Sequence, residues 1–176
     1  MEQIADVDLF EDRALLARIA RWSAGMLVAG LVPLACWALA GMPCEELGPA
    51  PLLWCALLCL GALPVHELVH AAFFLALGGP GTRVRFGARQ GMLYAEAPGL
   101  VLPAARFVVV LLAPMLLVSA AILALGIWAL GMPVAALVAF ATHLSGCAGD
   151  VVFACLVREL RATSVADSPH GIVLFG

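Results

Sequence analysis

The stretch LPVHELVHAAFF, residues 63–74, decides the fold. Its centre, His66-Glu67-Leu68-Val69-His70, lies inside a run from Pro51 to Leu77 in which all remaining residues are apolar or glycine. A helix of this length extends about 40 Å at 1.5 Å per residue, which is enough to cross a bilayer. We therefore expect a transmembrane helix that carries three ionisable side chains within it.

The three ionisable side chains form the pattern H-E-x-x-H. Two imidazoles four residues apart share one face of a helix, where they hold zinc, and the glutamate is the general base. Ionisable groups inside a bilayer are costly and by default mark a functional site. The pattern predicts His66 and His70 as metal ligands and Glu67 as the catalytic residue. The alternative is a coincidental helix with a structural hydrogen-bond network.

The composition is that of an integral membrane protein. Of the 176 residues, 64% are hydrophobic and 12% are charged, with a mean hydropathy of +1.08. Soluble domains are about 45–50% apolar and about 25% charged. All nine basic residues are arginines and form no basic stripe, so nucleic-acid binding is not expected. The six cysteines lack a CxxC spacing and are expected to be free.

Four apolar segments approach or exceed the about 20 residues that a membrane-spanning helix needs. They cover residues 23–42, 51–77, 104–130 and 133–157. We expect an all-α integral membrane protein with a four-span membrane domain at residues 23–157. Residues 1–22 are expected to form a cytoplasmic amphipathic segment, and residues 158–176 a cytoplasmic tail.

The arginines predict the orientation in the membrane. They lie before the first span, after the second and after the fourth, and the other two loops have none. By the positive-inside rule, both termini and the 78–103 loop are cytoplasmic in a multi-pass protein of the cell membrane. His66 and His70 then lie about 10–17 Å from the cytoplasmic end of their span, and Asp150 about 10–12 Å from the end of its own.

This equal depth makes Asp150 the predicted third metal ligand, since catalytic zinc has three protein ligands and one open position. His143 lies seven residues earlier, about 10 Å nearer the outside on a continuous helix. It remains open as an alternative ligand, a second-shell donor or an ordinary polar contact. His170, in the polar tail, is expected to be solvated. Small residues at 145–149, among them Gly146 and Gly149, predict close helix approach.

The loop after the second span contains a second pattern. Val84, Phe86, Met92 and Tyr94 flank a turn at Gly87–Gly91 and predict a short β-hairpin. Such a hairpin could offer an edge to an extended substrate, with Phe86 and Tyr94 as candidate substrate-binding residues. A cytoplasmic hairpin without a role in binding is the alternative.

The chain resembles the bacterial family of membrane zincin peptidases, over roughly residues 60 to 157. The segments that carry the resemblance are HELVHAAFF (66–74), RFGARQGMLYAEAPG (85–99), LLAPMLLV (111–118) and SGCAGD (145–150). More distantly it is similar to the site-2 proteases, intramembrane metalloproteases in which an aspartate on a later helix joins HExxH. That resemblance implies one Zn²⁺ per chain, held by His66, His70 and Asp150, with Glu67 as the base.

The sequence thus predicts a zinc-dependent, membrane-embedded peptidase that hydrolyses peptide bonds by metal-activated water. Its expected partners are the lipid bilayer and a membrane-spanning or membrane-associated protein or peptide substrate. One alternative is a non-catalytic accessory subunit with a structural metal site. Another is a metal transporter, which would need several metal-binding clusters where the sequence offers one.

Overall fold

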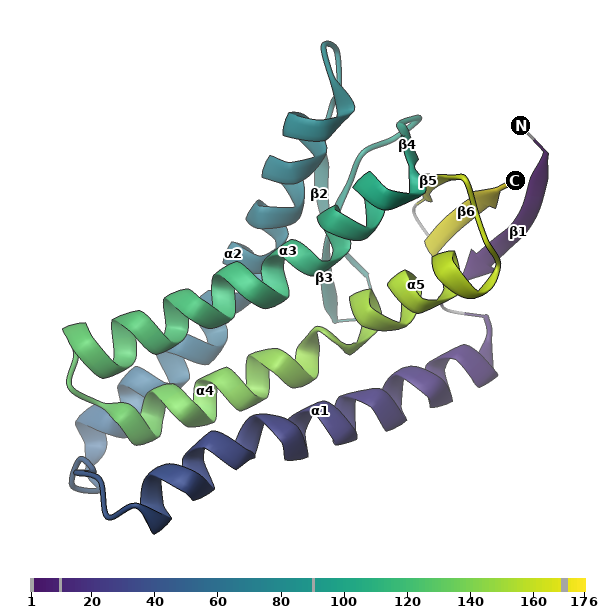
Figure 1. The fold of residues 1–176 in the computed structure, drawn as a ribbon. Helices are drawn as coiled ribbons and strands as arrows, with labels where there is room; N and C mark the ends of the chain where they lie inside the picture. The colour runs from purple at the N-terminus through teal and green to yellow at the C-terminus, as the bar shows by residue number, and fades with distance from the viewer. Residues whose placement is uncertain (1, 10, 90, 169–170) are drawn as a thin grey trace.

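The structure is a computed structural model and describes all residues except 1, 10, 90 and 169–170. Helices form most of it and two small antiparallel sheets form the rest (Figure 1). The helices are α1 (Arg13–Leu39), α2 (Pro49–Gly78), α3 (Ala104–Leu123) with a π-helical continuation η1 (Ala124–Ala129), α4 (Pro133–Gly146) and α5 (Ala148–Glu159). The strands are β1 (Gln3–Asp8), β2 (Arg85–Arg89), β3 (Met92–Glu96), β4 (Val101–Pro103), β5 (Ser164–Ser168) and β6 (Gly171–Phe175).

Four helical segments in the described part of the chain are long and apolar enough to cross a membrane. They cover 13–39, 49–78, 104–129 and 133–159, close to the four predicted spans. The first helix begins ten residues earlier than the predicted span. Asp12 caps it, because its carboxylate accepts hydrogen bonds from the N–H groups of Ala14 and Leu15 at 2.8 and 3.0 Å.

The fourth segment is two helices rather than one. The break is at Cys147, whose N–H bonds to the carbonyls of His143 and Leu144 at 3.1 and 3.2 Å. The chain then continues as α5, and Asp150 lies in the first turn of that helix. The break therefore places a carboxylate at a helix N-terminus, where the helix dipole favours negative charge.

Close contacts of α4 hold the helices together. A Cβ at Gly30 of α1 would lie 2.8 Å from the Cα of Ala141, so only glycine permits this approach. The Glu45 carboxylate, in the loop before α2, accepts hydrogen bonds from the first N–H groups of α4. The predicted role of Gly146 and Gly149 in close packing is wrong, because a Cβ at either position meets nothing within 4 Å.

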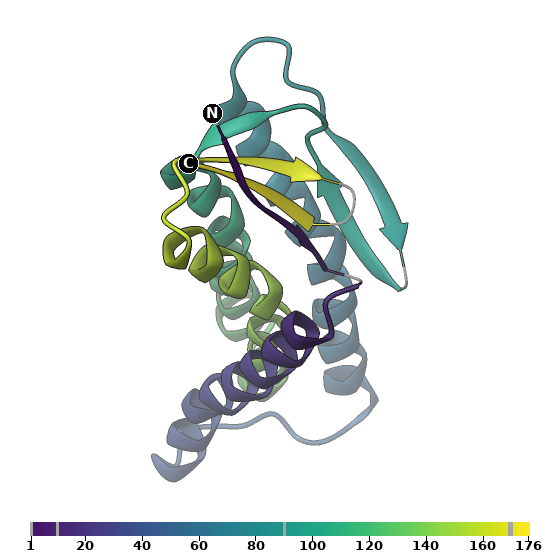
Figure 2. The same ribbon diagram turned by 90° about the vertical axis from the view of Figure 1, so that its right-hand side faces the viewer.

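The predicted hairpin is present as β2 and β3, which pair antiparallel from Arg85↔Glu96 to Arg89↔Met92. A second sheet, with strand order β1-β6-β5-β4, was not predicted, so the all-α description of the fold was too narrow. It brings both ends of the chain together (Figures 1 and 2). Its residues Val165, Ile172 and Leu174 are buried in one core with residues of α3 and α5.

Candidate metal centre

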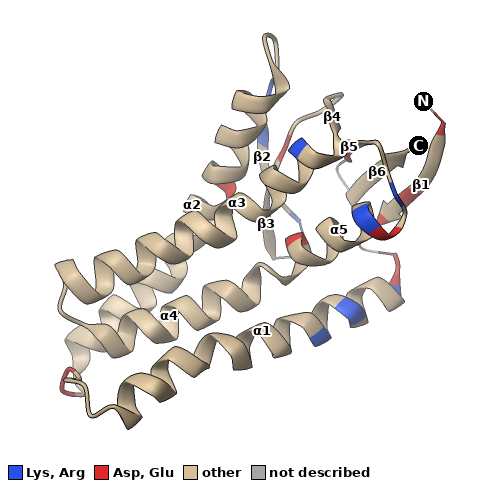
Figure 3. Cartoon of the chain, in the orientation of Figure 1, with Lys and Arg blue, Asp and Glu red and all other residues tan. Residues whose placement is uncertain are grey.

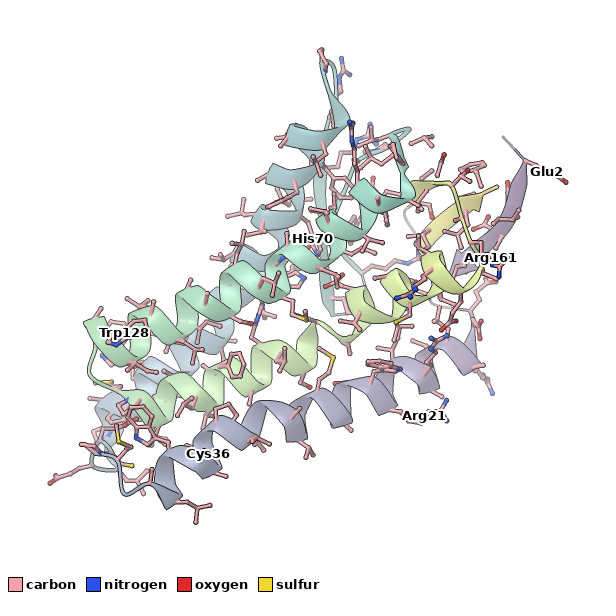
Figure 4. All side chains as sticks on the ribbon, in the orientation of Figure 1. Glu2, Arg21, Cys36, His70, Trp128 and Arg161 are labelled. Carbon is pink, nitrogen blue, oxygen red and sulfur yellow. The ribbon has the colours of Figure 1, made fainter. Side chains whose placement is uncertain are left out.

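The histidines of the HExxH pattern lie on the inward face of α2. His70 is 7% exposed and is labelled near the middle of the molecule, where α2 and α3 cross (Figure 4). Its Nε2 lies 3.0 Å from Nε2 of His66, one turn earlier. Two ring nitrogens that can each coordinate a metal ion therefore face the same point in space.

Asp150 completes this group from the other side. Its Oδ2 lies 3.1 Å from His66 Nε2 and its Oδ1 lies 3.5 Å from His70 Nε2. The side chain is 17% exposed, so it is largely withdrawn from solvent. The structure thus brings together the three residues predicted as ligands, from α2 and from the start of α5.

The spacing of these three donors fits zinc. Ligand atoms 2.0–2.1 Å from a tetrahedral ion are separated from one another by about 3.3 Å. The two imidazole nitrogens are 3.0 Å apart, and the two carboxylate oxygens of Asp150 lie 3.1 and 3.5 Å from one nitrogen each, close to that value. Two imidazoles and one carboxylate are also a donor set that zinc favours.

The backbone of α3 orients His70. The Nδ1 of His70 lies 2.9 Å from the carbonyl oxygen of Val110, which leaves Nε2 to face the ligand group. That carbonyl is available because Pro114, four residues later in α3, has no N–H to bond to it. A backbone carbonyl that holds the second nitrogen of a metal-ligating histidine is a common arrangement.

His143 lies beside His66, on the α4 side of the break at Cys147. Its Nε2 is 3.3 Å from His66 Nδ1, on the opposite side of the ring from His70 and Asp150. Its Nδ1 is 3.0 Å from Ser119 Oγ. His66, His143 and Cys147 could also hold a metal ion, through the other nitrogen of His66. Neither Ser119 nor Cys147 was predicted as a site residue.

A cavity of about 410 Å³ opens onto the ligand group. Glu67 and Asp150 line it, and so do Gly146 and Gly149, whose missing side chains leave it open. The backbone N–H of Ala95 on β3 is a hydrogen-bond partner of the Glu67 carboxylate. The predicted base and the predicted ligands therefore face one cavity.

A family model described as "Putative zincin peptidase" matches residues 59–165, which is more than half of the chain. The chain belongs to this zincin peptidase family. The matched segment contains the HExxH motif, the hairpin, Pro114 and Asp150, whereas β6 and most of β5, which also line the cavity, lie beyond it. No curated protein and no solved structure matches the chain.

Of the two aromatic residues that were predicted to bind substrate, one lines the cavity and the other does not. Tyr94 of this zincin peptidase lines the cavity, and its ring lies over Gly87 of β2. A Cβ at Gly87 would come within 2.3 Å of that ring, so glycine is required there. Phe86 is 57% exposed and is not among the residues that line the cavity.

Several further polar residues of the cavity wall were not predicted. Among them are Glu96 at the end of β3 and Asp167 and Ser168 of β5. Burial raises the pKa of Asp167 to about 7, and the nearby Glu96 carboxylate raises it as well. Asp167 comes from the unpredicted sheet, so no local pattern could place it here. His170 lies outside the described residues.

Proposed function

We propose that this zincin peptidase is a zinc-dependent, membrane-embedded enzyme that cleaves membrane-spanning or membrane-associated protein or peptide substrates. The observation that carries the proposal is the spacing of His66 Nε2, His70 Nε2 and the Asp150 carboxylate, between 3.0 and 3.5 Å. Glu67, next to His66 in the chain, faces the same cavity. The family match independently supports a metallopeptidase.

In this proposal His66, His70 and Asp150 hold one zinc ion per chain. Bound zinc supplies Lewis-acid chemistry, lowering the pKa of water and polarising a carbonyl group. The Glu67 carboxylate accepts a proton from the attacking water and passes it to the leaving amine. The Ala95 N–H keeps that carboxylate directed toward the cavity.

The second nitrogens of both histidines have roles of their own. Val110 accepts from His70 Nδ1, and His143 can accept from His66 Nδ1 while its own Nδ1–H donates to Ser119. These partners fix which nitrogen of each ring faces the ligand group. This supports a second-shell role for His143, with Asp150 as the third ligand.

The free edge of β3 is the proposed docking strip for substrate. The sheet has two strands, and two residues separate Arg89 from Met92, so Met92, Tyr94 and Glu96 bond to β2. The backbone groups of Leu93 and Ala95 therefore point away from β2. Because the Ala95 N–H bonds to Glu67, an extended substrate could pair with this edge through the Leu93 backbone and the Ala95 carbonyl.

The distribution of charge supports a membrane orientation with both termini cytoplasmic. Arginines lie at the end of the molecule that carries the termini and the hairpin, and the α1–α2 loop at the opposite end is acidic (Figure 3). In this orientation the cavity faces the cytoplasmic side, from which water would enter.

The substitution Glu67→Gln tests the proposed function. The purified variant should retain its zinc, because glutamine leaves both histidines and Asp150 in place, and should lose cleavage of a transmembrane-peptide library by at least about 100-fold. The matched control is Glu46→Gln, which makes the same change at an exposed residue far from the cavity. A Glu67→Gln variant as active as wild type would contradict the proposal. A wild type that binds zinc but cleaves nothing would favour the non-catalytic alternative.

A further inference from the structure

Two carboxylates of the cavity wall, Glu96 and Asp167, form no ion pair with any described residue. Glu96 is 9% exposed, and Asp167 faces the same cavity from β5. Arg85 is opposite Glu96 in the hairpin register, but it is exposed and forms no ion pair with it. A buried carboxylate is costly unless it is protonated or meets a cation, so a cation in this cavity would stabilise the ionised form of both.

Unpaired oxygen atoms gather at the same place. Among the described residues, the buried side-chain atoms without a hydrogen-bond partner are Glu96 Oε2 and Ser168 Oγ. Both residues line the cavity beside Asp167. Asp167 Oδ2 accepts one hydrogen bond, from the Ala97 N–H at 2.9 Å. Buried polar atoms are rarely left unpaired, and the residues that carry these two line the cavity that also opens onto the metal centre.

We propose that Glu96, Asp167 and Ser168 form a subsite for a positively charged N–H group of the substrate. Two carboxylates and one hydroxyl oxygen match the donors of an ammonium or guanidinium ion. The proposal rests on the proposed peptidase function and specifies which substrates that function accepts. Burial raises the pKa of Asp167, and a cation bound in the subsite would lower it again.

The subsite lies close to the bond that is cut. Ala95, whose N–H contacts Glu67, is the residue immediately before Glu96. Successive strand residues are about 3.3 Å apart, so the charged group belongs within one or two residues of the scissile bond. The cation is then either the α-ammonium group at the N-terminus of a peptide or the side chain of a lysine or arginine near the cleavage site.

Matched peptides test the subsite in the full-length, zinc-loaded protein in detergent. Three kinds of apolar twelve-residue peptide that share one sequence are compared by mass spectrometry of their products. The first has an acetylated N-terminus and one lysine, whose position is varied along the peptide. The second is acetylated and has norleucine in place of the lysine, and the third has norleucine and a free N-terminus. Binding of the same peptides to the Glu67→Gln variant is measured by fluorescence anisotropy.

A cation should improve kcat/KM or binding by about tenfold or more over the neutral, acetylated peptide. Preference for lysine identifies a side-chain site, and preference for the free N-terminus identifies an amino-terminal one. The ratio of kcat/KM for the cationic peptide to kcat/KM for the neutral one should fall toward one in Glu96→Gln and in Asp167→Asn. It should stay at the wild-type value in Glu46→Gln. Thermal unfolding of each variant checks that it is folded.

Three results distinguish a failure of the proposed subsite from a failure of the proposed function. Cleavage with equal rates for all peptides would overturn the subsite and leave the proposed function standing. No cleavage by wild type would contradict the proposed function, and the anisotropy series would then decide the subsite alone. Loss of a second equivalent of zinc from Glu96→Gln would show that the carboxylates hold a metal ion, which would also overturn the proposal.

Discussion

The carbonyl of Val110 contacts the ring of His70, and Pro114 is the residue that leaves this carbonyl free. An interior proline is visible in the sequence, and the rule that it frees the carbonyl four residues earlier needs no structure. Which side chain then uses that carbonyl depends on how α2 crosses α3. Sequence reasoning could therefore predict the unpaired acceptor but not its partner.

Replacing Pro114 by alanine should weaken zinc binding. The new N–H at position 114 would compete with His70 Nδ1 for the Val110 carbonyl, and loss of an outer-shell partner costs about 10–100-fold in metal affinity. Competition with a zinc chelator measures the effect. Pro33→Ala, which makes the same change inside α1, is the control. Equal zinc affinity of Pro114→Ala and wild type would show that the carbonyl does not support the centre.

Asp167 predicts a specific pH dependence of stability. Its pKa is about 7 in the folded protein against an ordinary value of 3.8, and the titratable groups that face it are Glu96 and His70. The folded state therefore holds its proton more tightly than the unfolded state. The stabilisation is complete below about pH 4 and is lost as the pH rises through about 7.

Asp167→Asn, which cannot ionise, should remove this loss. Its melting temperature in detergent should exceed that of wild type at about pH 8 by more than it does at about pH 5. Thermal unfolding of both proteins across this range measures the difference. An equal difference in melting temperature at both pH values would mean that Asp167 is ionised in the folded as well as the unfolded state.

The break between α4 and α5 lies between the two residues of the fourth segment that contact His66. His143 precedes the break and Asp150 follows it, and each contacts one ring nitrogen of His66. The apolar run 133–157 predicts one span because hydropathy does not register a one-residue interruption of a helix. The flanking Gly146 and Gly149 lower helix propensity and are the only local indication of a break.

The β2–β3 hairpin supplies a prediction of its own. Gly87→Ala should displace Tyr94, since the added Cβ would lie 2.3 Å from the tyrosine ring. Forcing an extra methyl group into a packed site typically costs about 1–3 kcal/mol, which a shift of the tyrosine ring would relieve. If Tyr94 shapes the cavity for substrate, kcat/KM for cleavage should then fall about tenfold. Gly25→Ala on α1, where a Cβ meets nothing within 4 Å, is the control. Unchanged kcat/KM in Gly87→Ala would remove Tyr94 from the substrate site.

Across the whole molecule, the two chain ends complete the fold. Gln3 pairs with Phe175 in the sheet, and Arg18 on α1 forms an ion pair with Glu159 on α5. Four spans and the hairpin were predictable because length, hydropathy and glycine turns are local properties. The terminal sheet was not, because β1 pairs with β6 across almost the full length of the chain and its short strands carry little periodicity.

This sheet should be essential for stability. Leu174→Ala in β6 removes a fully buried side chain and should cost about 2–5 kcal/mol of unfolding free energy. Ile4→Ala in β1, which is 45% exposed, should cost much less. Thermal or denaturant unfolding in detergent compares the two. Similar losses would show that the sheet is not packed as the structure has it.

The proposed function depends on His66, His70 and Asp150 binding one zinc ion. The zinc content of the purified protein, measured for wild type, Asp150→Ala and His143→Ala, tests this directly. We expect about one zinc per chain in wild type, near-complete loss in Asp150→Ala and retention in His143→Ala, because His143 contacts His66 at its other nitrogen. Retention of zinc by Asp150→Ala with loss in His143→Ala would overturn this ligand set and place the ion among His66, His143 and Cys147.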